Sequence, residues 1–279
     1  MLSFTKMHGA GNDFIVVEAE GGERDWAGFA RRACDRHFGI GADGVLLVSS
    51  SEVADIRMRI INADGSEAEM CGNGVRCVAK YAIERGLVAG DLLRLETGVG
   101  VLAVEAARDA RGSVVRARAS MGEPRFDAAQ IPAAIEGEAP LRNVSLTVDG
   151  QTVAVTLVSM GNPHAVHFWA RPVTAYPLAQ IGPKVEHHPA FPNRTNFEIA
   201  RVIDRSRMEA RVWERGVGET LACGSGACAS VVAARLLHMV DDVVDIALPG
   251  GTLTVEWNGS GEVYLSGPVE HVFTGTWPD

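Results

Sequence analysis

The chain has 279 residues, of which 47% are hydrophobic and 22% charged, the composition of a globular protein with one or two domains. Its net charge of −9 disfavours a polyanionic partner, so we expect no binding to nucleic acid. The first residues lack a signal-peptide pattern, and no stretch approaches the roughly 20 apolar residues of a membrane span. We therefore expect a cytoplasmic protein without a membrane partner.

The first forty residues predict two strands and a helix. Apolar runs predict strands at residues 2–6 and 14–18, and the loop between them, residues 7–13, contains two glycines that permit tight backbone geometry. Apolar residues at helical spacing predict a helix over residues 24–38. Cys34 lies on the apolar face of this helix, so we predict that it is a core residue.

Residues 39–44, GIGADG, match the dinucleotide-binding pattern G-x-G-x-x-G. That pattern requires a strand before it and a helix after it, whereas here a helix precedes it and the strand-like run VLLV follows. We therefore predict a mobile or substrate-facing loop and no dinucleotide cofactor.

The rest of the chain contains strand-like runs around two glycine-free helical runs that follow CGNG and CGSG. Strands are predicted at residues 56–61, 92–97, 99–104, 114–119, 143–148, 151–159, 196–202, 208–213, 243–248, 251–257 and 262–266. Two prolines and lost periodicity at residues 121–132 indicate a crossing into the second half, and the proline-rich residues 170–192 predict irregular structure. The tail falls outside this pattern and is expected to return as a strand to the first domain.

Two stretches of the chain are alike, because EMCGNGVRCVAKYAIERG at residues 69–86 is echoed by LACGSGACASVVAARLLH at residues 221–238. Matching residues precede the two cysteines at nearly equal spacing, namely Asn12 and Asn62 before Cys71, and Asn162 and Glu214 before Cys223. The spacing predicts an internal duplication with domains of roughly 130 residues each. We place them at residues 1–120 plus 268–279 and at residues 121–267, and expect the two thiols to meet across a cleft.

Each repeated cysteine begins a predicted helix. Unpaired N–H groups and the helix dipole favour an anion there, so we expect both thiols to ionise more readily than a free cysteine, whose pKa is about 8.5. The residues after each cysteine leave backbone N–H groups free to hold a carboxylate. These residues are Gly72, Asn73 and Gly74 in the first copy, and Gly224, Ser225 and Gly226 in the second.

Two such thiols could serve three different purposes. A zinc site would pair each cysteine with Cys77 or Cys228, but the intervals are long and the second cysteine lies within the helix, so we expect no metal. A thiol nucleophile with His164 as its base explains only one of two equivalent cysteines. A two-base proton transfer at a carbon uses both thiols, one to remove a proton and the other to return one from the opposite face. We favour the last use, and a non-catalytic amino-acid-binding protein stays open.

Four motifs, MHGAGNDF, NADGSEAEMCGNGVRC, SMGNPHAV and ERGVGETLACGSGACA, closely resemble those of the diaminopimelate epimerase family in order and spacing. The resemblance implies an α+β fold of two similar domains, each a mostly antiparallel sheet wrapped around a central helix. It also implies cofactor-independent interconversion of LL- and meso-diaminopimelate, on the route to lysine and peptidoglycan, by a homodimer. A related two-cysteine racemase of another amino acid is the alternative.

The resemblance further implies roles for individual residues. Cys71 and Cys223 would be the catalytic bases, and His164 and Glu214 would tune the pKa values of the thiols. The substrate carboxylate at the reacting centre would be held by Gly72, Asn73, Gly224 and Ser225, and the rest of the substrate would be lined by Asn12, Asn62, Asn162, Asn196, Glu214 and Arg215. Arg215 can pair with a distal carboxylate and Glu214 with a distal ammonium. Gly44 stands where some family members carry a glutamine, so that contact is missing or is made by backbone.

Overall fold

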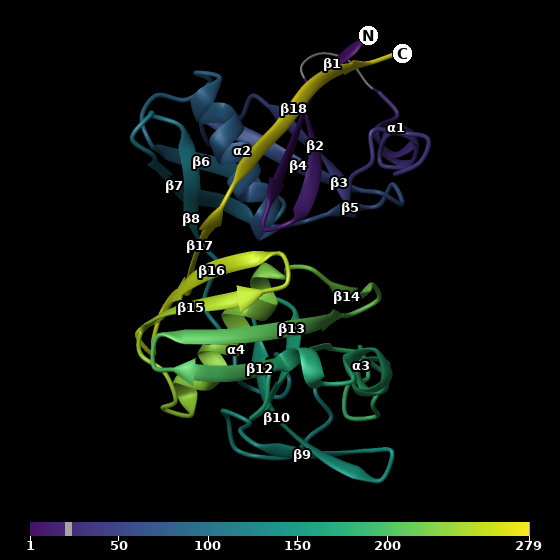
Figure 1. Cartoon of the computed structure of the whole chain (residues 1–279), viewed down its shortest axis with the longest axis vertical. Coiled ribbons are helices and arrows are strands. Elements are labelled where there is room, and N and C mark those ends of the chain that lie inside the picture. Colours follow the sequence, from purple (N-terminus) through teal and green to yellow (C-terminus); the bar gives the residue numbers. More distant parts are fainter. Residues whose placement is uncertain (20–23, 279) are drawn as a thin grey trace. The chain divides into compact units, whose positions relative to one another are not determined.

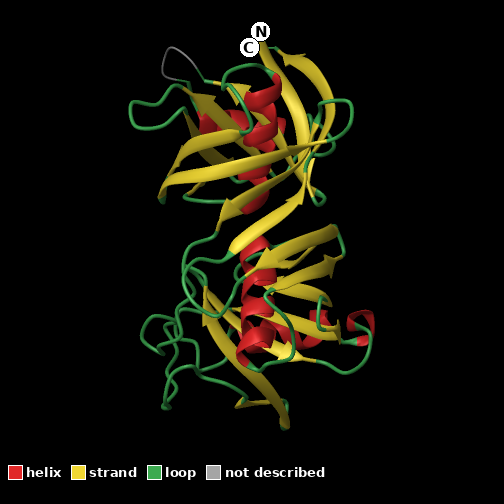
Figure 2. Cartoon of the chain, turned by 90° about the vertical axis from the view of Figure 1, so that its left-hand side faces the viewer, coloured by secondary structure: helices red, strands yellow, loops and turns green. Residues whose placement is uncertain are grey.

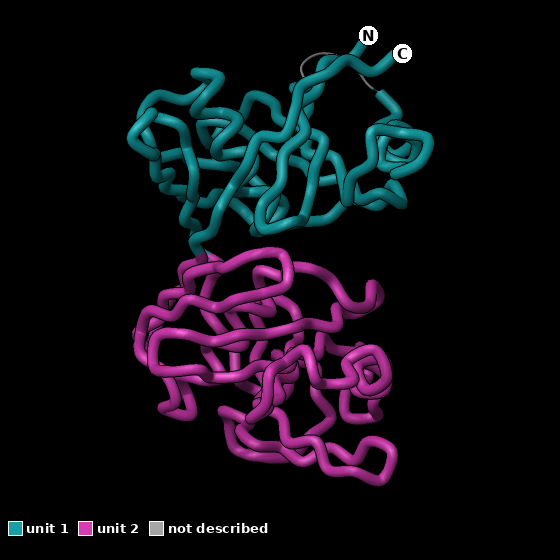
Figure 3. Tube along the Cα trace, in the orientation of Figure 1, with its two compact units in different colours: residues 1–120, 266–279 teal, residues 121–265 magenta. Residues whose placement is uncertain are grey.

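The computed structural model describes residues 1–19 and 24–278. Residues 20–23 and Asp279, both within the predicted first domain, lie outside the described residues. The chain forms two compact units, shown in teal and magenta in Figure 3. Unit 1 comprises residues 1–120 and 266–279, and unit 2 comprises residues 121–265.

Unit 1 is built from a mostly antiparallel sheet and two helices (Figure 1). Its elements are β1 (Leu2–Gly9), β2 (Asn12–Glu18), α1 (Trp26–Ala33), β3 (Gly44–Ser49), β4 (Ile56–Asn62), β5 (Glu67–Ala68), α2 (Gly72–Glu84), β6 (Leu92–Thr97), β7 (Gly100–Arg108), β8 (Val114–Ser120) and β18 (Glu270–Trp277). The pairs β1–β2, β3–β4, β6–β7 and β7–β8 are antiparallel, whereas β2–β3 and β4–β6 are parallel. The predicted strands of this unit are confirmed, and β6 has the predicted bounds.

Helix α2 forms the centre of unit 1. Its side chains at Val75, Val78, Ala79 and Ala82 are fully buried and pack against residues of β1 to β4 and β6 to β8. In Figure 2 strands surround the helix within each unit. Burying one such valine stabilises the fold by roughly 1.5–3 kcal/mol, so a helix buried all round is held chiefly by packing. The expected sheet wrapped around a central helix is confirmed.

Helix α1 covers the other face of the same sheet. Successive strand residues point to opposite faces, so Phe14 and Val16 of β2 join the core around α2, whereas Ile15 and Val17 pack with Phe29 of α1. Because β2 is buried on both faces, its sequence is a continuous apolar run instead of an alternating one.

The predicted helix over residues 24–38 is too long, because α1 ends at Ala33. The Oδ1 of Asp35 accepts hydrogen bonds from the backbone N–H groups of His37 and Phe38, both at 2.7 Å. Such local side-chain bonds offer the backbone an alternative to helical pairing. Cys34 is buried in the core as predicted.

The predicted loop at residues 7–13 is also too long. Strand β1 continues to Gly9 and β2 begins at Asn12, which pairs with Gly9 across the turn. Only Ala10 and Gly11 form the connection, with φ angles of 53° and 80°. Positive φ at both central residues is the geometry of the tightest β-hairpins, so Asn12 is held on a rigid strand end.

Unit 2 repeats the architecture of unit 1. Its elements are β9 (Val144–Val148), β10 (Gln151–Ser159), β11 (Pro163–Phe168), η1 (Val173–Ala175), α3 (Leu178–Glu186), β12 (Asn196–Asp204), β13 (Arg207–Glu214), β14 (Gly218–Thr220), α4 (Gly224–Leu236), β15 (Val243–Leu248), β16 (Gly251–Glu256) and β17 (Tyr264–Pro268), whose last residues belong to unit 1. The pairs β10–β11, β11–β12, β12–β13, β13–β15 and β15–β16 alternate between antiparallel and parallel. This is the order of β1, β2, β3, β4, β6 and β7, so the predicted duplication of the α+β fold is confirmed.

The prediction of irregular structure over residues 170–192 is wrong, because α3 occupies Leu178–Glu186. Pro183 lies inside this helix and cannot donate to the helical ladder. Leu178, Ile181 and Val185 nevertheless pack into the core of unit 2. Tertiary burial therefore outweighs the local penalty. Helix α3 joins the parallel strands β11 and β12 as α1 joins β2 and β3.

The C-terminal segment completes the sheet of unit 1. Strand β18 pairs antiparallel with β1, with Leu2 opposite Trp277 (Figure 1). The expected return of the tail to the first domain is confirmed. Within residues 1–19 and 24–278, none of the helices has the length and apolar character that crossing a bilayer requires.

Candidate active site

Cys71 is the N-cap of helix α2, as the sequence predicted. Its backbone is extended, with φ −147° and ψ 113°, and its carbonyl accepts from the N–H of Val75 at 2.9 Å. Its Sγ donates to the Oδ1 of Asn12 at 3.6 Å, and the Nδ2 of Asn73 donates to the same oxygen at 3.0 Å. The structure thus gathers three predicted site residues at one helix end.

The orientation of these amides follows from their charged neighbours. The Nδ2 of Asn12 donates to the Oδ2 of Asp43 at 2.7 Å, and a carboxylate can only accept, so Oδ1 of Asn12 faces Cys71. Likewise the Nη2 of buried Arg76 donates to the Oδ1 of Asn73 at 2.6 Å, which leaves Nδ2 of Asn73 for Asn12. The Sγ of Cys71 therefore faces a hydrogen-bond acceptor.

An ion-pair network supports the strand end that carries Asn12. Asp13 accepts from Lys6 at 2.5 Å and from Arg36 at 2.7 Å, and Arg36 also donates to Asp43 at 2.7 Å. Burial by itself raises the pKa of Asp13, but the hydrogen bonds from Arg36 and Lys6 outweigh it and lower the pKa to about 2. No local sequence pattern marks this network, because only the fold brings its members together.

Cys223 is the N-cap of helix α4 with the same geometry, φ −117° and ψ 115°. Its carbonyl accepts from the N–H of Ala227 at 3.0 Å, and its Sγ accepts from the N–H of Gly226 at 3.4 Å. The hydroxyl of Ser225 lies 3.5 Å from Sγ. This sulfur therefore has donors around it, as the expected helix N-terminal site requires.

Further polar residues continue from Ser225 into the core of unit 2. The Nδ2 of Asn162 donates to the Oγ of Ser225 at 3.3 Å, and the Oδ1 of Asn162 lies 2.9 Å from the Nε2 of His164. The Nδ1 of His164 lies 2.7 Å from the Oε1 of Glu198. His164 is thus connected to Cys223 through Asn162 and Ser225. The family resemblance implied that His164 tunes the pKa of a thiol, and this role stays a prediction.

The expected ease of ionisation is wrong for Cys223. Burial raises the pKa of its thiol well above the ordinary value, and the negative charge of Glu214 raises it further. The hydrogen bonds from Ser225 and Gly226 lower the pKa, but they do not offset these effects. Because desolvation dominates, the helix N-terminus alone does not make this thiol acidic.

The ends of β12 and β13 hold the motif ERG near the second cysteine helix. The Nδ2 of Asn196 donates to the carbonyl of Pro163 at 2.8 Å, and its Oδ1 accepts from the N–H of Arg215 at 2.9 Å. The carboxylate of Glu214 accepts from the hydroxyl of Thr220. Asn196 therefore fixes the backbone from which Glu214 and Arg215 project.

The other predicted residues are placed as follows. Asn62 ends β4, and its Nδ2 donates to the Oγ of Ser66 at 2.9 Å. Gly72 and Gly224 are the first residues of α2 and α4. A Cβ at Gly44 would lie 2.9 Å from the carbonyl oxygen of Ile61, so a glutamine there would need a backbone shift.

Sequence reasoning missed Arg76 and Glu198, both 1% exposed. Glu198 carried a readable signal, because it lies two residues after Asn196 and so points to the same face of β12. The signal for Arg76 was its place in the helical run directly after CGNG.

The remaining thiols are structural. Cys77 and Cys228 are fully buried within their helices, as predicted, and burial raises the pKa of Cys77 to about 12. Burial likewise raises the pKa of Cys34 to about 12. Over residues 1–19 and 24–278, no three His, Cys, Asp or Glu side chains are grouped to hold a metal ion.

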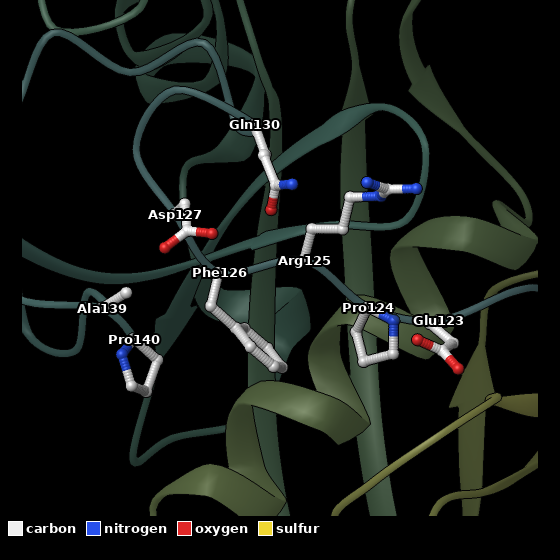
Figure 4. Close-up of a pocket in the computed structure, with 8 residues that line it drawn as sticks. All are labelled: Glu123, Pro124, Arg125, Phe126, Asp127, Gln130, Ala139 and Pro140. Atoms are coloured by element: carbon white, nitrogen blue, oxygen red, sulfur yellow. The ribbon is translucent and has the colours of Figure 1, made fainter.

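Two surface hollows of the structure contain none of the predicted site residues. A hollow of about 400 Å³ in unit 2 is lined by Glu123, Pro124, Arg125, Phe126, Asp127, Gln130, Ala139 and Pro140 (Figure 4). A second hollow of about 580 Å³ in unit 1 lies between the start of α1 and the β4–β5 hairpin. Neither includes a residue of the two cysteine helices.

Solved structures share this fold at low sequence identity. A phenazine biosynthesis protein of the PhzF family from Bacillus anthracis superposes with a TM-score of 0.70 at 18% identity, covering 98% of each chain. A hydroxyproline epimerase from Agrobacterium vitis superposes with a TM-score of 0.72 at 14% identity, covering 98% of this chain and 91% of its own. These likenesses establish the fold alone.

Sequence relatives are far closer. The family model for diaminopimelate epimerase matches residues 4–126 and 156–272. The diaminopimelate epimerase of Heliobacterium modesticaldum is 48% identical over 99% of this chain and 100% of its own, and that of Moorella thermoacetica is 48% identical over 99% of each. These matches confirm the resemblance carried by the four motifs, and the chain belongs to the diaminopimelate epimerase family.

Proposed function

We propose that this chain interconverts LL- and meso-diaminopimelate by proton transfer at the α-carbon between two thiols, Cys71 and Cys223, without a cofactor. The observation that carries the proposal is the duplicated helix N-cap cysteine. Each copy has an asparagine on a hairpin end that hydrogen-bonds the residue two positions after the cysteine, Asn12 with Asn73 and Asn162 with Ser225.

The proposed reaction moves one proton in and one proton out. One thiolate removes the α-proton, the electron pair passes into the carboxylate as an enediolate, and the other thiol returns a proton to the opposite face. The carbon is inverted, and thiol and thiolate have exchanged places, so the reverse reaction uses the same groups. Backbone N–H groups at the starts of α2 and α4 would stabilise the growing negative charge.

The charge pattern around Cys223 suits a substrate with an ammonium group. Burial raises the pKa of Cys223 most, and the negative charge of Glu214 raises it further. A substrate ammonium beside Glu214 would cancel the charge of that carboxylate. Arg215 would pair with the distal carboxylate, a contact best made by a planar guanidinium. Asn12, Asn62, Asn162 and Asn196 would complete the polar lining. Substrate binding would then lower the pKa of the thiol at the moment it is needed.

The test incubates purified, dialysed protein with LL-diaminopimelate in D₂O. Turnover is measured as deuterium incorporation at the α-carbon and as formation of the meso isomer. We expect turnover without added pyridoxal phosphate or metal. Cys71→Ser and Cys223→Ser should each nearly abolish it, because a serine hydroxyl is far too weak an acid near neutral pH. Cys34→Ala is the control, since that thiol is a buried core residue, and it should leave activity unchanged.

Three results would overturn the proposal. Full activity in either serine variant would contradict the two-base chemistry. Turnover of another amino acid with diaminopimelate inert would favour a related two-cysteine racemase. Tight binding without deuterium exchange would favour a binding protein. The homodimer is also proposed, on the family resemblance, and light scattering of the purified protein measures it.

A further inference from the structure

Unit 2 contains a buried histidine–glutamate pair to which the proposed reaction assigns no separate task. His164 is fully buried and Glu198 is 1% exposed, and their Nδ1 and Oε1 atoms lie 2.7 Å apart. The second oxygen of Glu198, Oε2, is buried without a hydrogen-bond partner among the described residues. Burying an unpaired carboxylate oxygen is costly, so a fold that keeps this pair gains something else from it.

The pair heads a hydrogen-bond chain that ends at the catalytic sulfur. The Nε2 of His164 lies 2.9 Å from the Oδ1 of Asn162, which can only accept, so Nε2 carries a hydrogen. The Nδ2 of Asn162 then donates to Ser225, whose hydroxyl is left to donate to the Sγ of Cys223 at 3.5 Å. Each bond in the chain depends on the one before it.

Glu198 selects the ring state that this chain requires. An imidazole with its single hydrogen on Nδ1 would turn a bare Nε2 toward the Oδ1 of Asn162. Facing Glu198, Nδ1 either accepts from the protonated carboxyl or donates as part of an imidazolium, and Nε2 keeps its hydrogen in both cases. Burial raises the pKa of Glu198, which makes the first arrangement accessible.

In unit 1 the places that match His164 and Glu198 are occupied by apolar residues. In the parallel register of unit 2, His164 lies opposite Asn196, and in unit 1 Phe14 lies opposite Gly44. Two residues along β3 from Gly44, Leu46 takes the place that Glu198 takes in β12.

The glycine directly after Ser225 or Asn73 confirms the correspondence by contact. A Cβ at Gly226 would lie 2.9 Å from the Oε1 of Glu198, whereas a Cβ at Gly74 would lie 3.0 Å from the Cδ2 of Leu46. Hence Glu198 and Leu46 pack against the first turn of equivalent helices, one as a carboxyl and the other as a hydrocarbon.

We propose that Glu198 is a positioning residue that fixes the ring state of His164 and, through Asn162 and Ser225, the hydrogen-bond donor at Cys223. Its effect is confined to the proton transfer served by Cys223, because Phe14 and Leu46 stand at the matching places behind Cys71. This inference rests on the proposed two-thiol function and assigns a task within the same site.

The test separates the two thiols by substrate isomer. A diaminopimelate analogue with fluorine on the β-carbon needs proton abstraction only: the thiolate takes the α-proton, the C–F bond breaks, a carbon–carbon double bond forms and fluoride is released. Each α-isomer depends on the thiolate that faces its proton. Cys71→Ser and Cys223→Ser identify which isomer each thiol serves. Conversion of LL-diaminopimelate to the meso isomer by the wild-type protein tests the proposed function independently.

Glu198→Gln keeps the shape of the side chain but pairs with either imidazole tautomer. We expect kcat for the isomer served by Cys223 to fall about 10- to 100-fold with little change in KM, as for loss of a residue that orients a histidine. The isomer served by Cys71 should stay within about twofold, and this also shows that the variant is folded. Equal losses on both isomers, or no loss on either, would overturn the proposal.

A second variant guards against misfolding of the first. His164→Phe combined with Glu198→Leu rebuilds in unit 2 the residues found in unit 1. It should lose fluoride release from the isomer served by Cys223 and keep release from the other. Normal release from both isomers would show that the buried pair has no part in positioning.

Discussion

The ion-pair network behind Asn12 makes a prediction that can be worked from the structure. Asp13 joins Lys6 of β1, which is 7% exposed, to Arg36, and its partners lie 7 and 23 residues away in the sequence. Asp13→Asn keeps the shape of the side chain and removes its charge. Lys6 would then retain its bond to the carbonyl of Gly41 but lose its counter-ion, so we expect unit 1 to be destabilised.

The size of the effect follows from the pKa of Asp13. The folded protein lowers this pKa from 3.8 to about 2, and one pKa unit corresponds to about 1.4 kcal/mol, so the ideal contribution is about 2.5 kcal/mol. Exposure of Arg36, at 56%, screens part of the network, which reduces the expected effect to roughly 1–2 kcal/mol. Because the folded pKa is the lower one, this stability is present above pH 3.8 and is lost as the pH falls toward 2.

Urea unfolding at several pH values between 7 and 2.5 measures this effect. The difference in unfolding free energy between the wild type and Asp13→Asn should be largest near pH 7 and should shrink below pH 4. Asp204→Asn is the matched control, because the pKa of Asp204 is also about 2 but its partners Ser206 and Arg207 are close in sequence. Such local bonds can persist in the unfolded chain, so that variant should change stability less. A difference for Asp13→Asn that does not vary with pH would refute the reasoning.

Two further predictions concern the cysteine helices. Gly226→Ala should lower the thermal midpoint of unfolding by more than Gly74→Ala does. The new Cβ at 226 would lie 2.9 Å from the buried carboxyl of Glu198, whereas the Cβ at 74 meets the flexible end of the Leu46 side chain. Calorimetry compares the two variants, and equal shifts would contradict this prediction. The proposed two-thiol reaction also predicts that mild oxidation inactivates the enzyme by joining Cys71 to Cys223, and that dithiothreitol restores activity. Peptide mapping of the inactive form without that bond would contradict the prediction.

Elements with a strong local pattern were predictable from the sequence. Strands β6, β10 and β15 have the predicted bounds, because apolar runs between turn residues carry their own signal. The cysteine helices begin where predicted, because a run without glycine or proline follows each of the motifs CGNG and CGSG. Helix α3 was missed because Pro183 and its neighbours mask the pattern. The duplication held the missing information, since β11 and β12 need a crossover as β2 and β3 do.

The chemistry of the site depends on contacts that no local pattern contains. The sequence by itself determined that Cys71 and Cys223 cap equivalent helices and that matched asparagines precede them, because these features are periodic and repeated. Only the tertiary structure decided that Glu198 stands behind His164, 34 residues away, since the parallel register of β11 and β12 brings them together. It also decided the pKa of Cys223, which burial and the charge of Glu214 raise. A helix N-terminus is a local property, whereas desolvation and the field of distant charges arise only when the chain packs.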